Sequence, residues 1–470
     1  MRIPVPSSIP GATELGNVHF VGIGGAGLSA IARLMAQQGV RVTGSDAFDS
    51  AVVRALQSEG ITCHVGHDAA HLDGVDTVIA STAVRDDNPE VVEAQRRDLR
   101  LWPRSAGLRS VMEGRRTIAV AGTHGKTTTT AMLTCALIAA GADPSFAIGA
   151  EVASLGANAR LGAGDLLVAE ADESDGAFLV YEPELAVVTN VDADHLDNYG
   201  TVEAYDAAFD EFVGRIGRAV VLSVDDPGAL ALADAARAAG LEVLLAGFGD
   251  DADLQGRGLT IEGITTRFTA SWRGVDLGPV ELAVPGGHYA LDALLALGAG
   301  LLLDQNVDLL IAGLGAYTGA NRRMQHLGES GGVRVYDSYA HHPTEIHADL
   351  AAARAVAGDG RLVVAYQPHL VSRTRIYGAD MGRALSAADR VVVADIYLAR
   401  EDPDPDVTSA LVAEAVSGPP VSVGGPVAGL AAVLVPELRP GDLLLTLGAG
   451  DITTVGPAVL ALLETRTEAP

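Results

Sequence analysis

The chain has 470 residues, a formal charge of −28 at pH 7 and two cysteines, Cys63 and Cys135. This length predicts about three domains with separate cores. The negative charge opposes general binding to nucleic acid or to an anionic membrane, because both require a basic face. Two cysteines without a CxxC pair exclude a disulfide scaffold, and no apolar run reaches the roughly 20 residues of a membrane span. We therefore expect a soluble cytoplasmic protein that binds small ligands.

The first predicted unit is a βαβ arrangement. An apolar strand at 18–21 precedes the glycine-rich loop 22–27, a helix continues to about Gln38, and a second strand at 40–43 leads into Gly44-Ser45-Asp46. Glycines at the three fingerprint positions and an acid after the second strand are typical of dinucleotide binding, in which the acid contacts a ribose. Such a fingerprint alone is weak evidence, and αβ alternation continues from it to about Gly114.

Three histidines in this first unit have a spacing that could bind a metal. His64, His67 and His71 lie in a polar stretch that has no cysteine and no carboxylate at a strand end. A zinc site normally draws on such ligands. We therefore favour a plain surface turn and helix for this stretch.

The second predicted unit contains Lys126, which is the single lysine of the chain. An apolar strand at 117–120 leads into the loop Ala121-Gly-Thr-His-Gly-Lys-Thr127, and residues 130–137 have helical composition. A strand, a glycine-rich loop and a helix with this lysine form a phosphate cradle, in which backbone N–H groups face the anion and the following hydroxyl can bind Mg²⁺. The loop is shorter than the general pattern, and it predicts an ATP site.

Two further apolar runs each end in a burst of acidic residues. Residues 166–169 lead into Glu170-Ala-Asp-Glu-Ser-Asp175, and residues 185–189 lead into Asn190-Val-Asp-Ala-Asp-His195. Ligands of a parallel α/β sheet bind beyond the carboxyl ends of its strands, so both clusters should stand beside the lysine loop. Carboxylates and an imidazole there suit Mg²⁺, although solvated acidic loops are the alternative in so acidic a chain. Residues from about 241 to 285 predict irregular strands in an antiparallel insertion or edge.

The last part of the chain repeats the α/β pattern from about Asn321. Apolar strands at 333–336, 362–366, 391–394 and 443–447 end in polar groups, which predicts a third α/β domain with one functional edge. His341 and His342 follow the first of these strands and are site candidates. Arg322 and Arg323 lie at the domain junction, where an arginine pair can bind a transferred phosphoryl group.

These motifs together resemble those of the Mur ligase family over nearly the whole chain. The resemblance rests on residues 122–127, 170–175, Asp194-His195 and Asp337-Ser-Tyr-Ala-His-His-Pro343. Within the family, residues 21–29, 44–46, 367–374 and 448–451 resemble the branch that adds L-alanine to UDP-N-acetylmuramate. Several sister ligases carry a carbamylated lysine after the Asp-His motif, a device that is impossible here because Lys126 is the only lysine.

The resemblance implies a three-domain α/β fold: a Rossmann-like domain at 1–114 for the UDP-sugar, a central P-loop-type domain at 115–320 for MgATP, and a Rossmann-like domain at 321–470 that contributes to ATP and amino-acid binding. It also implies roles for individual residues. The implied UDP-sugar ligands are Gly22, Gly24, Gly25, Gly27, Ser45, Asp46, Ser81 and Thr82. The implied ATP ligands are Gly122, Thr123, His124, Gly125, Lys126, Thr127, Thr128, His288, Asp292, Arg323 and Asp337. The implied Mg²⁺ ligands are Thr127, Glu170 and His195, and the implied amino-acid ligands are Tyr339, His341, His369 and Arg373. The implied catalytic residues are Lys126, His195, Arg323, Arg373 and His341.

In the implied reaction, ATP phosphorylates the lactyl carboxylate of UDP-N-acetylmuramate, and the amine of L-alanine then displaces phosphate. Two alternatives remain. A recycling ligase of the same family attaches a preformed tripeptide to the same UDP-sugar. A non-enzymatic NAD-binding regulator would account for residues 18–46, but it would leave the lysine loop and the acidic clusters unexplained.

Overall fold

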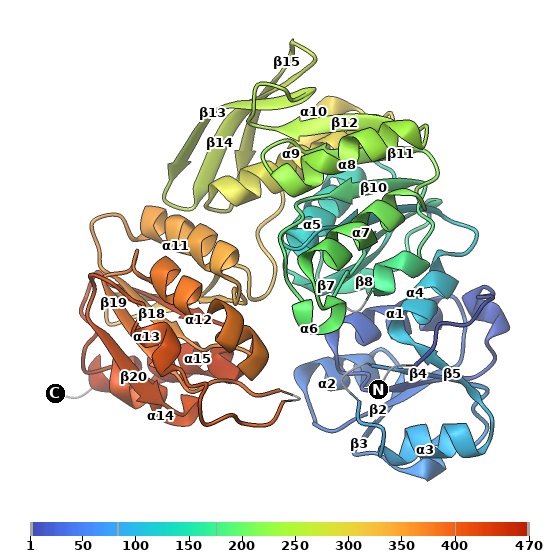
Figure 1. Ribbon diagram of the computed structural model, residues 1–470, viewed down its shortest axis with the longest axis horizontal. Helices are drawn as coiled ribbons and strands as arrows, with labels where there is room; N and C mark the ends of the chain where they lie inside the picture. The colour runs from blue at the N-terminus through green and yellow to red at the C-terminus, as the bar shows by residue number, and fades with distance from the viewer. Residues whose placement is uncertain (1–2, 82–83, 175, 400, 468–470) are drawn as a thin grey trace. The chain divides into compact units, whose positions relative to one another are not determined.

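The computed structural model describes residues 3–81, 84–174, 176–399 and 401–467, and its strands form three sheets (Figure 1). The chain divides into two compact units. The first unit contains Met1–Arg257, Ala270–Gly278 and Leu291–Tyr317, and the second contains Gly258–Thr269, Pro279–Ala290 and Thr318–Pro470. The predicted three-domain α/β architecture is confirmed, because each sheet consists mainly of parallel strands with intervening helices.

The first sheet has the strand order β3-β2-β1-β4-β5, and all its neighbouring strands are parallel. The strands are β1 (Val18–Val21), β2 (Val42–Asp46), β3 (Thr62–Val65), β4 (Thr77–Ala80) and β5 (Arg100–Pro103). The helices are η1 (Ala12–Glu14), α1 (Ala26–Gln37), α2 (Ala51–Ser58), η2 (Ala69–Leu72), α3 (Pro89–Arg96) and α4 (Arg104–Met112). The predicted βαβ unit is confirmed, with one refinement: Asp46 is the last residue of β2 and does not follow it.

The second sheet has the order β15-β14-β13-β12-β11-β10-β6-β9-β7-β8. Its strands are β6 (Arg116–Ala121), β7 (Ser145–Val152), β8 (Ala157–Arg160), β9 (Leu166–Glu170), β10 (Leu185–Val188), β11 (Ala219–Ser223), β12 (Glu242–Gly247), β13 (Leu254–Glu262), β14 (Thr265–Trp272) and β15 (Val275–Leu282). The helices that accompany it are α5 (Lys126–Ala139), η3 (Ala177–Val180), α6 (Leu196–Tyr199), α7 (Val202–Val213), α8 (Pro227–Ala238), α9 (Gly287–Leu302) and α10 (Val307–Gly315). β10 and β11 are buried at every position, as expected for strands covered on both faces.

The order of the central strands places the predicted acidic clusters beside the lysine loop. β6 lies between β9 and β10, and it is parallel to both. Ala121 at the end of β6 pairs with Val188 of β10, and Val120 pairs with Glu170 of β9. All three strands therefore end at one edge of the sheet, as the sequence predicted.

The prediction of an antiparallel insertion at 241–285 was wrong for its first strand. β12 is parallel to β11 and follows α8, because residues 219–247 form an ordinary β-helix-β crossover. β13, β14 and β15 extend the sheet beyond β12, and they are joined by the two-residue turns Gly263-Ile264 and Arg273-Gly274. Such turns join antiparallel strands, so the edge part of the prediction holds for these three.

The third sheet has the order β16-β17-β21-β18-β19-β20 and is parallel except for the pair β16–β17. Its strands are β16 (Gln325–Ser330), β17 (Val333–Ser338), β18 (Leu362–Tyr366), β19 (Arg390–Ala394), β20 (Val421–Gly425) and β21 (Leu443–Leu447). Its helices are α11 (Pro343–Ala357), α12 (Val371–Leu385), α13 (Ala410–Ala413), α14 (Val427–Leu434), η4 (Asp451–Thr454) and α15 (Val455–Thr467). The four strands predicted from the sequence, β17, β18, β19 and β21, form the contiguous centre of this sheet.

Two findings bear on the class of protein. Both cysteines are free thiols, with Cys135 buried and Cys63 half-buried. Among the residues that the structure describes, no helix has both the length and the apolar character needed to cross a membrane.

Candidate functional site

The lysine loop connects the buried strand β6 to the long helix α5. Two glycines make this tight connection possible. A Cβ atom on Gly122, whose φ is +127°, would lie 2.1 Å from the Thr189 hydroxyl, and one on Gly125, whose φ is +81°, would lie 2.6 Å from Asp292 Oδ1. Only glycine fits such positions. Because α5 begins at Lys126, its unpaired N–H groups and positive dipole end face the loop, an arrangement suited to phosphate.

Lys126 is held inside the loop by the residues around it. Its Nζ donates hydrogen bonds to the backbone oxygens of Gly122 (2.7 Å) and Thr123 (3.0 Å) and to Glu173 Oε2 (2.6 Å). Burial lowers the pKa of Lys126, but the carboxylates of Glu173, Asp172 and Glu170 outweigh it, so the pKa is raised and the ammonium stays charged. The structure thus places the single lysine of the chain as a fixed positive charge at the start of α5.

Glu173 is a residue that the motif analysis did not single out. Its side chain is completely buried, and burial raises its pKa to about 7 although the Lys126 ammonium acts in the opposite direction. One oxygen binds Lys126, and the other, Oε1, makes no hydrogen bond and lies 3.8 Å from His195 Nε2. A buried carboxylate oxygen without a hydrogen bond requires an explanation, and a bound cation supplies one. Its signal in the sequence was its place three residues after Glu170, the first acid of the 170–175 cluster.

The predicted Mg²⁺ ligands lie on the elements that meet at this edge. Thr127 is buried in the first turn of α5, Glu170 ends β9 and His195 precedes α6. Glu170 Oε1 accepts a hydrogen bond of 2.5 Å from Gly149 N of β7. With Glu173, these residues offer mostly oxygen donors, which suits Mg²⁺. The oxygen-rich set of side chains, together with the Glu173 Oε1 atom that makes no hydrogen bond, therefore fits Mg²⁺. The assignment of each ligand remains a prediction.

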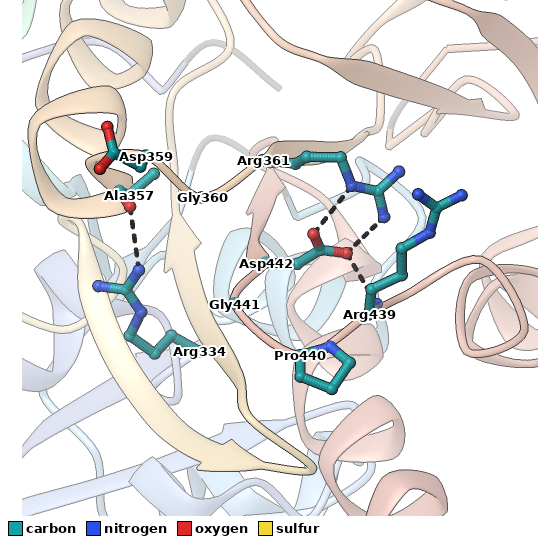
Figure 2. Close-up of a pocket in the computed structure, with 9 residues that line it drawn as sticks. All are labelled: Arg334, Ala357, Asp359, Gly360, Arg361, Arg439, Pro440, Gly441 and Asp442. Carbon is teal, nitrogen blue, oxygen red and sulfur yellow. Dashed lines mark hydrogen bonds and ion pairs between the residues drawn. The ribbon is translucent and has the colours of Figure 1, made fainter.

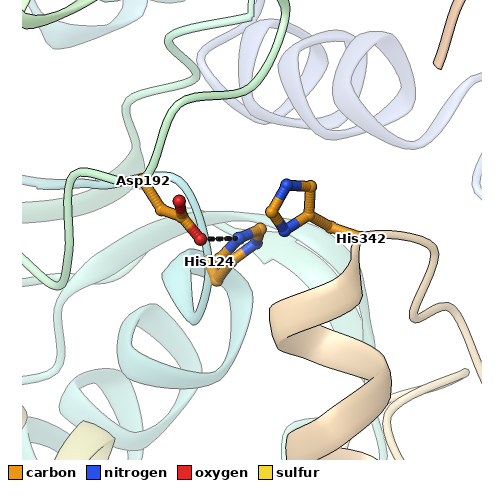
Figure 3. Close-up of side chains that lie close together, drawn as sticks. All are labelled: His124, Asp192 and His342. Atoms are coloured by element: carbon orange, nitrogen blue, oxygen red, sulfur yellow. Dashed lines mark ion pairs between the residues drawn. The ribbon is translucent and has the colours of Figure 1, made fainter. Parts of the chain in front are cut away.

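His124 and Asp192 face each other across the neighbouring loops (Figure 3). His124 Nε2 lies 3.6 Å from Asp192 Oδ2. The Asn190 side chain holds the loop, because its Oδ1 accepts from His124 N (2.8 Å) and its Nδ2 donates to His124 O (3.0 Å). Asn190 therefore fixes the register between the end of β10 and the lysine loop.

Asp292 lies behind the lysine loop. It is buried in α9, and its Oδ1 accepts a hydrogen bond of 3.1 Å from the Thr129 hydroxyl of α5. This contact explains why a carboxylate packs directly against Gly125. The adenine contact implied for Asp292 remains a prediction, and so does the phosphate contact implied for Thr128, which is buried in α5.

The glycine loop of the first sheet is fixed by the end of β2. Asp46 Oδ2 accepts from Gly24 N (2.9 Å), and a Cβ on Gly24 would lie 2.9 Å from that oxygen. Ser45 is completely buried and donates its hydroxyl to Glu90 Oε2 at 2.5 Å. Ser81 follows β4 beside Gly22, and Thr82 lies outside the described residues, as does Asp175 of the acidic cluster. The loop residues Gly25 and Gly27 stand at the start of α1, in the position predicted for a phosphate group.

The stretch with the three histidines contains the favoured turn and a short helix, but the three side chains are half-buried and do not lie on a plain surface. His64 lies in β3 and His71 in η2, and their rings stack with centroids 4.0 Å apart. His67 and His71 turn inward to the buried carboxylate of Glu90. A carboxylate partner was therefore present after all, but it comes from α3, about 20 residues further along the chain.

Arg104 is a second residue that the sequence analysis missed. It begins α4, and its Nη2 donates to Asp172 Oδ2 at 2.7 Å. Burial raises the pKa of Asp172, but Arg104 and Lys126 outweigh it and hold the pKa below the usual range. A Cβ on Gly27 would lie 3.0 Å from Arg104 Nη1. Arg104 therefore links the glycine loop of the first sheet to the acidic cluster of the second.

In the second unit, the structure brings together the four residues predicted to bind the amino acid. The rings of Tyr339 and His341 lie 5.3 Å apart, and those of His341 and His369 lie 5.8 Å apart. Arg373 Nη1 lies 3.3 Å from His369 Nδ1. Glu345 in the first turn of α11 accepts from His341 N at 3.0 Å and fixes the turn that carries Tyr339 and His341. They follow β17 and β18, whose carboxyl ends lie on opposite sides of β21.

The two junction arginines have different surroundings. Arg322 donates to Asp337 Oδ2 (3.3 Å) and to Gly448 O (2.5 Å), while Arg323 lies 3.7 Å from Glu345. Asp337 is completely buried, and it also accepts from the hydroxyls of Thr446 and Thr453. Asp337 therefore joins three segments of this unit in the structure, and its implied contact with the ATP ribose remains a prediction.

The half-buried His288 and the buried Asp349 form a titratable pair in this unit. His288 Nε2 lies 3.9 Å from Asp349 Oδ1. Burial lowers the pKa of His288 to about 4, and the nearby Arg323 charge acts in the same direction. Burial raises the pKa of Asp349 to about 7, although a hydrogen bond from Ser338 opposes it. Both side chains are therefore held toward their neutral forms.

Replacing Asp349 with asparagine should stabilise the protein at high pH. Because the folded-state pKa of about 7 exceeds the ordinary 3.8, the stability contributed by the Asp349 proton is complete below about pH 4 and is lost as the pH rises through 7. Asp349→Asn is neutral at every pH, so its free energy of unfolding should exceed that of the wild type by roughly 4 kcal/mol at pH 8 and by roughly 2 kcal/mol at pH 5. Thermal melts at both pH values measure this, with Asp359→Asn, an exposed acid beyond α11, as control. Equal shifts at both pH values would contradict the assignment.

A separate hollow of about 580 Å³ lies at the opposite end of the third sheet (Figure 2). It is lined by Arg334, Arg361, Arg439 and Asp442, which lie near the amino ends of β17, β18 and β21. Arg361 binds Asp442 through two hydrogen bonds of 2.9 and 2.6 Å. None of the predicted site residues lines this hollow, because they follow the carboxyl ends of the strands.

Comparison with protein families identifies the three parts of the chain. Residues 17–116 match the Mur ligase family, catalytic domain, residues 120–300 match the Mur ligase middle domain, and residues 322–450 match the Mur ligase, glutamate ligase domain. These matches follow the three sheets.

Curated relatives and solved structures agree with the family models. The chain is 58% identical over 99% of its length to the whole UDP-N-acetylmuramate--L-alanine ligase of Nocardioides sp., and 50% identical over 99% to the whole ligase of that name from Kineococcus radiotolerans. The crystal structure of UDP-N-acetylmuramate-alanine ligase from Thermotoga maritima matches 96% of this chain and 99% of its own, with a TM-score of 0.82 and 28% identity. A murein peptide ligase from Psychrobacter arcticus matches the same shares with a TM-score of 0.72 and 25% identity. The family matches and the full-length relatives together establish that the chain belongs to the Mur ligase family.

Proposed function

We propose that this protein joins L-alanine to the lactyl carboxylate of UDP-N-acetylmuramate, with conversion of ATP to ADP and phosphate, in peptidoglycan precursor synthesis. The observation that carries the proposal is the lysine loop of β6 and α5, flanked by β9 and β10 with their acidic ends. The choice of alanine over a tripeptide is supported by the 58% identity to an alanine ligase, against 25% to the murein peptide ligase.

In this proposal residues 1–114 hold the UDP-sugar, 115–320 hold ATP, and 321–470 contribute to ATP and amino-acid binding. A lactyl carboxylate oxygen attacks the γ-phosphorus and ADP leaves, which gives an acyl phosphate. The amine of L-alanine then attacks the acyl carbon, loses a proton and expels phosphate. Catalysis of such transfers is mainly positioning and electrostatic stabilisation.

The residues of this chain supply those two effects. The α5 N-terminus and Lys126 hold the outer phosphates and stabilise the negative charge that accumulates during transfer. Thr127, Glu170 and His195 would hold Mg²⁺, which supplies Lewis-acid neutralisation of phosphate charge when bound. Tyr339, His341, His369 and Arg373 would hold L-alanine and the reacting carboxyl group, with Arg323 at the γ-phosphate.

One assay tests the reaction. ADP release from MgATP and UDP-N-acetylmuramate should depend on L-alanine, and a preformed tripeptide should not replace it. Turnover with the tripeptide alone would favour the recycling ligase, and NAD binding without ATP turnover would favour the regulator.

The role of Asp46 can be tested separately. Asp46 ends β2 and organises the glycine loop, in the position of a ribose-binding acid. Asp46→Ala should raise the KM for the UDP-sugar about tenfold, as expected for the loss of a charge-assisted hydrogen bond, and should leave the KM for ATP nearly unchanged. Asp49→Ala, three residues further on and exposed, is the matched control. An unchanged UDP-sugar KM would remove Asp46 from that site.

A further inference from the structure

Glu90 is a completely buried carboxylate in the first turn of α3. Burial by itself would raise its pKa, but contacts with His19, Ser45 and His71 outweigh burial and lower the pKa to about 2. Glu90 therefore carries a negative charge inside the first domain. A buried charge is tolerated only where partners compensate it.

The partners of Glu90 come from β1, β2, η2 and the loop after β3. Ser45 Oγ and His67 Nδ1 lie 2.5 and 2.9 Å from Oε2, and His71 Nδ1 lies 2.7 Å from Oε1. His19 is also completely buried, and its Nε2 lies 3.5 Å from Oε1 without a hydrogen bond. Other groups among the described residues also contact this cluster: the Asp68 backbone N–H, the Thr43 hydroxyl at the far nitrogen of His19, the His64 ring stacked on His71, and the Asn88 side chain, which accepts from Glu90 N.

Hydrogen bonding in this cluster fixes the tautomers of two imidazoles. An ionised carboxylate only accepts hydrogen bonds, so the Nδ1 atoms of His67 and His71, which face Glu90, must carry hydrogens. The partners given above include no lysine or arginine, so the Glu90 charge is compensated by the Ser45 hydroxyl and these imidazole N–H groups.

The cluster is connected directly to the glycine loop through Ser45. The Ser45 carbonyl oxygen accepts hydrogen bonds from Gly22 N (2.8 Å) and Ile23 N (3.0 Å). The next residue, Asp46, binds Gly24 N with its side chain, and its carbonyl accepts from Gly66 N (2.7 Å), the neighbour of His67. Glu90 thus fixes Ser45. The Ser45 backbone and the neighbouring residue Asp46 together set the conformation of the glycine loop.

We propose that Glu90 is a positioning residue for the UDP-sugar site: together with the imidazoles of His67 and His71, it fixes Ser45 and thereby holds the glycine loop and Asp46 in the form that binds the substrate. This inference rests on the proposed function of the loop. Glu90 itself is buried behind the loop and acts through Ser45, so it affects binding of the UDP-sugar and not the phosphoryl transfer.

The first test separates binding from chemistry. Glu90→Gln keeps the shape of the side chain and removes its charge. We expect the KM for UDP-N-acetylmuramate to rise about tenfold, which corresponds to the loss of roughly one charge-assisted hydrogen bond. The kcat and the KM for ATP should change less than about twofold. Glu93→Gln on the same helix is the matched control, because Glu93 binds Arg96 and Arg97 at the surface. An unchanged UDP-sugar KM, or an equal change in both KM values, would overturn the proposal.

The second test uses the imidazole that binds Glu90 Oε1. His71→Gln should raise the KM for UDP-N-acetylmuramate in the same direction as Glu90→Gln, because Glu90 then loses the contact of its Oε1 atom with His71 Nδ1. An unchanged UDP-sugar KM in His71→Gln would overturn the role of this contact.

The third test asks whether Glu90 acts through Ser45. In a double-mutant cycle, Ser45→Ala and Glu90→Gln should not be additive in the UDP-sugar KM, whereas additive effects would contradict the mechanism.

MgATP binding measured by calorimetry shows whether each variant is folded, and His71→Gln replaces Glu90→Gln if the latter is not. Failure of the wild type to turn over UDP-N-acetylmuramate would refute the proposed function, whereas a normal wild type with a normal Glu90→Gln variant would refute only this inference.

Discussion

Replacing Lys126 with methionine is expected to reduce turnover at least about a hundredfold. The Nζ atom is held at the start of α5 by two loop carbonyls and Glu173, so its charge is already positioned where the outer phosphates would bind. Loss of a preorganised charge that stabilises the transition state commonly costs a few kcal/mol, or about a hundredfold or more in rate. The measurement is kcat for ADP release with UDP-N-acetylmuramate and L-alanine.

Two further variants sharpen the Lys126 experiment. Lys126→Arg should restore little activity, because a planar guanidinium cannot replace a compact ammonium in a loop this tight. Arg116→Met removes a cation from the other end of β6, where it pairs with Glu184 near the surface, and should leave turnover nearly unchanged. If Lys126→Met kept normal turnover, the phosphate-cradle interpretation of this loop would be wrong.

The surroundings of Lys126 determine how fast an amine-directed reagent should acylate it. An amine-directed reagent can modify only Lys126 and the N-terminal amine, since the chain has no other lysine. The Lys126 side chain is 15% exposed, and the carboxylates around it raise its pKa. Acylation at neutral pH should therefore be slow, and MgATP should slow it further.

The lysine loop and its neighbours could be predicted because the signals are local. Gly122 and Gly125 are required by the backbone of one short turn, and the acids follow directly after the apolar strands β9 and β10. Parallel strands present their carboxyl ends at one edge, so local motifs converge without any knowledge of long-range contacts. Tyr339, His341, His369 and Arg373 lie together for the same reason, because they follow the carboxyl ends of parallel strands in one sheet.

The residues that were missed depend on contacts between distant segments. Glu90 approaches His19, Ser45, His67 and His71 only after β1, β2, η2 and α3 are packed, and its own surroundings in the sequence resemble an ordinary helix start. Arg104 similarly lies 68 residues from Asp172. A single sequence gives no signal for such pairs, because charge and spacing do not say which acid meets which base.

His195 combines two features of a functional residue. Its backbone has φ +54°, a left-handed conformation that is uncommon for residues other than glycine and recurs at binding sites. Its Nε2 lies 3.8 Å from the Glu173 oxygen that makes no hydrogen bond, at the edge of the sheet that carries Lys126. The His195 ring thus lies beside the carboxylates of Glu173 and Asp194, where the metal role predicted for it can be tested.

Replacing His195 with alanine should raise the Mg²⁺ concentration for half-maximal turnover between about 10- and 100-fold, the cost that is usual for disrupting a metal shell, and should lower kcat. UDP-sugar affinity measured by calorimetry should stay nearly intact, because the glycine loop lies on another sheet. His195→Asn should recover part of the loss, since asparagine tolerates the left-handed conformation and offers an oxygen ligand. His347→Ala on the exposed face of α11 controls for removal of an imidazole elsewhere. A magnesium dependence that is the same in His195→Ala and in the wild type would exclude His195 from the metal shell and leave Thr127, Glu170 and Glu173 as the residues to test.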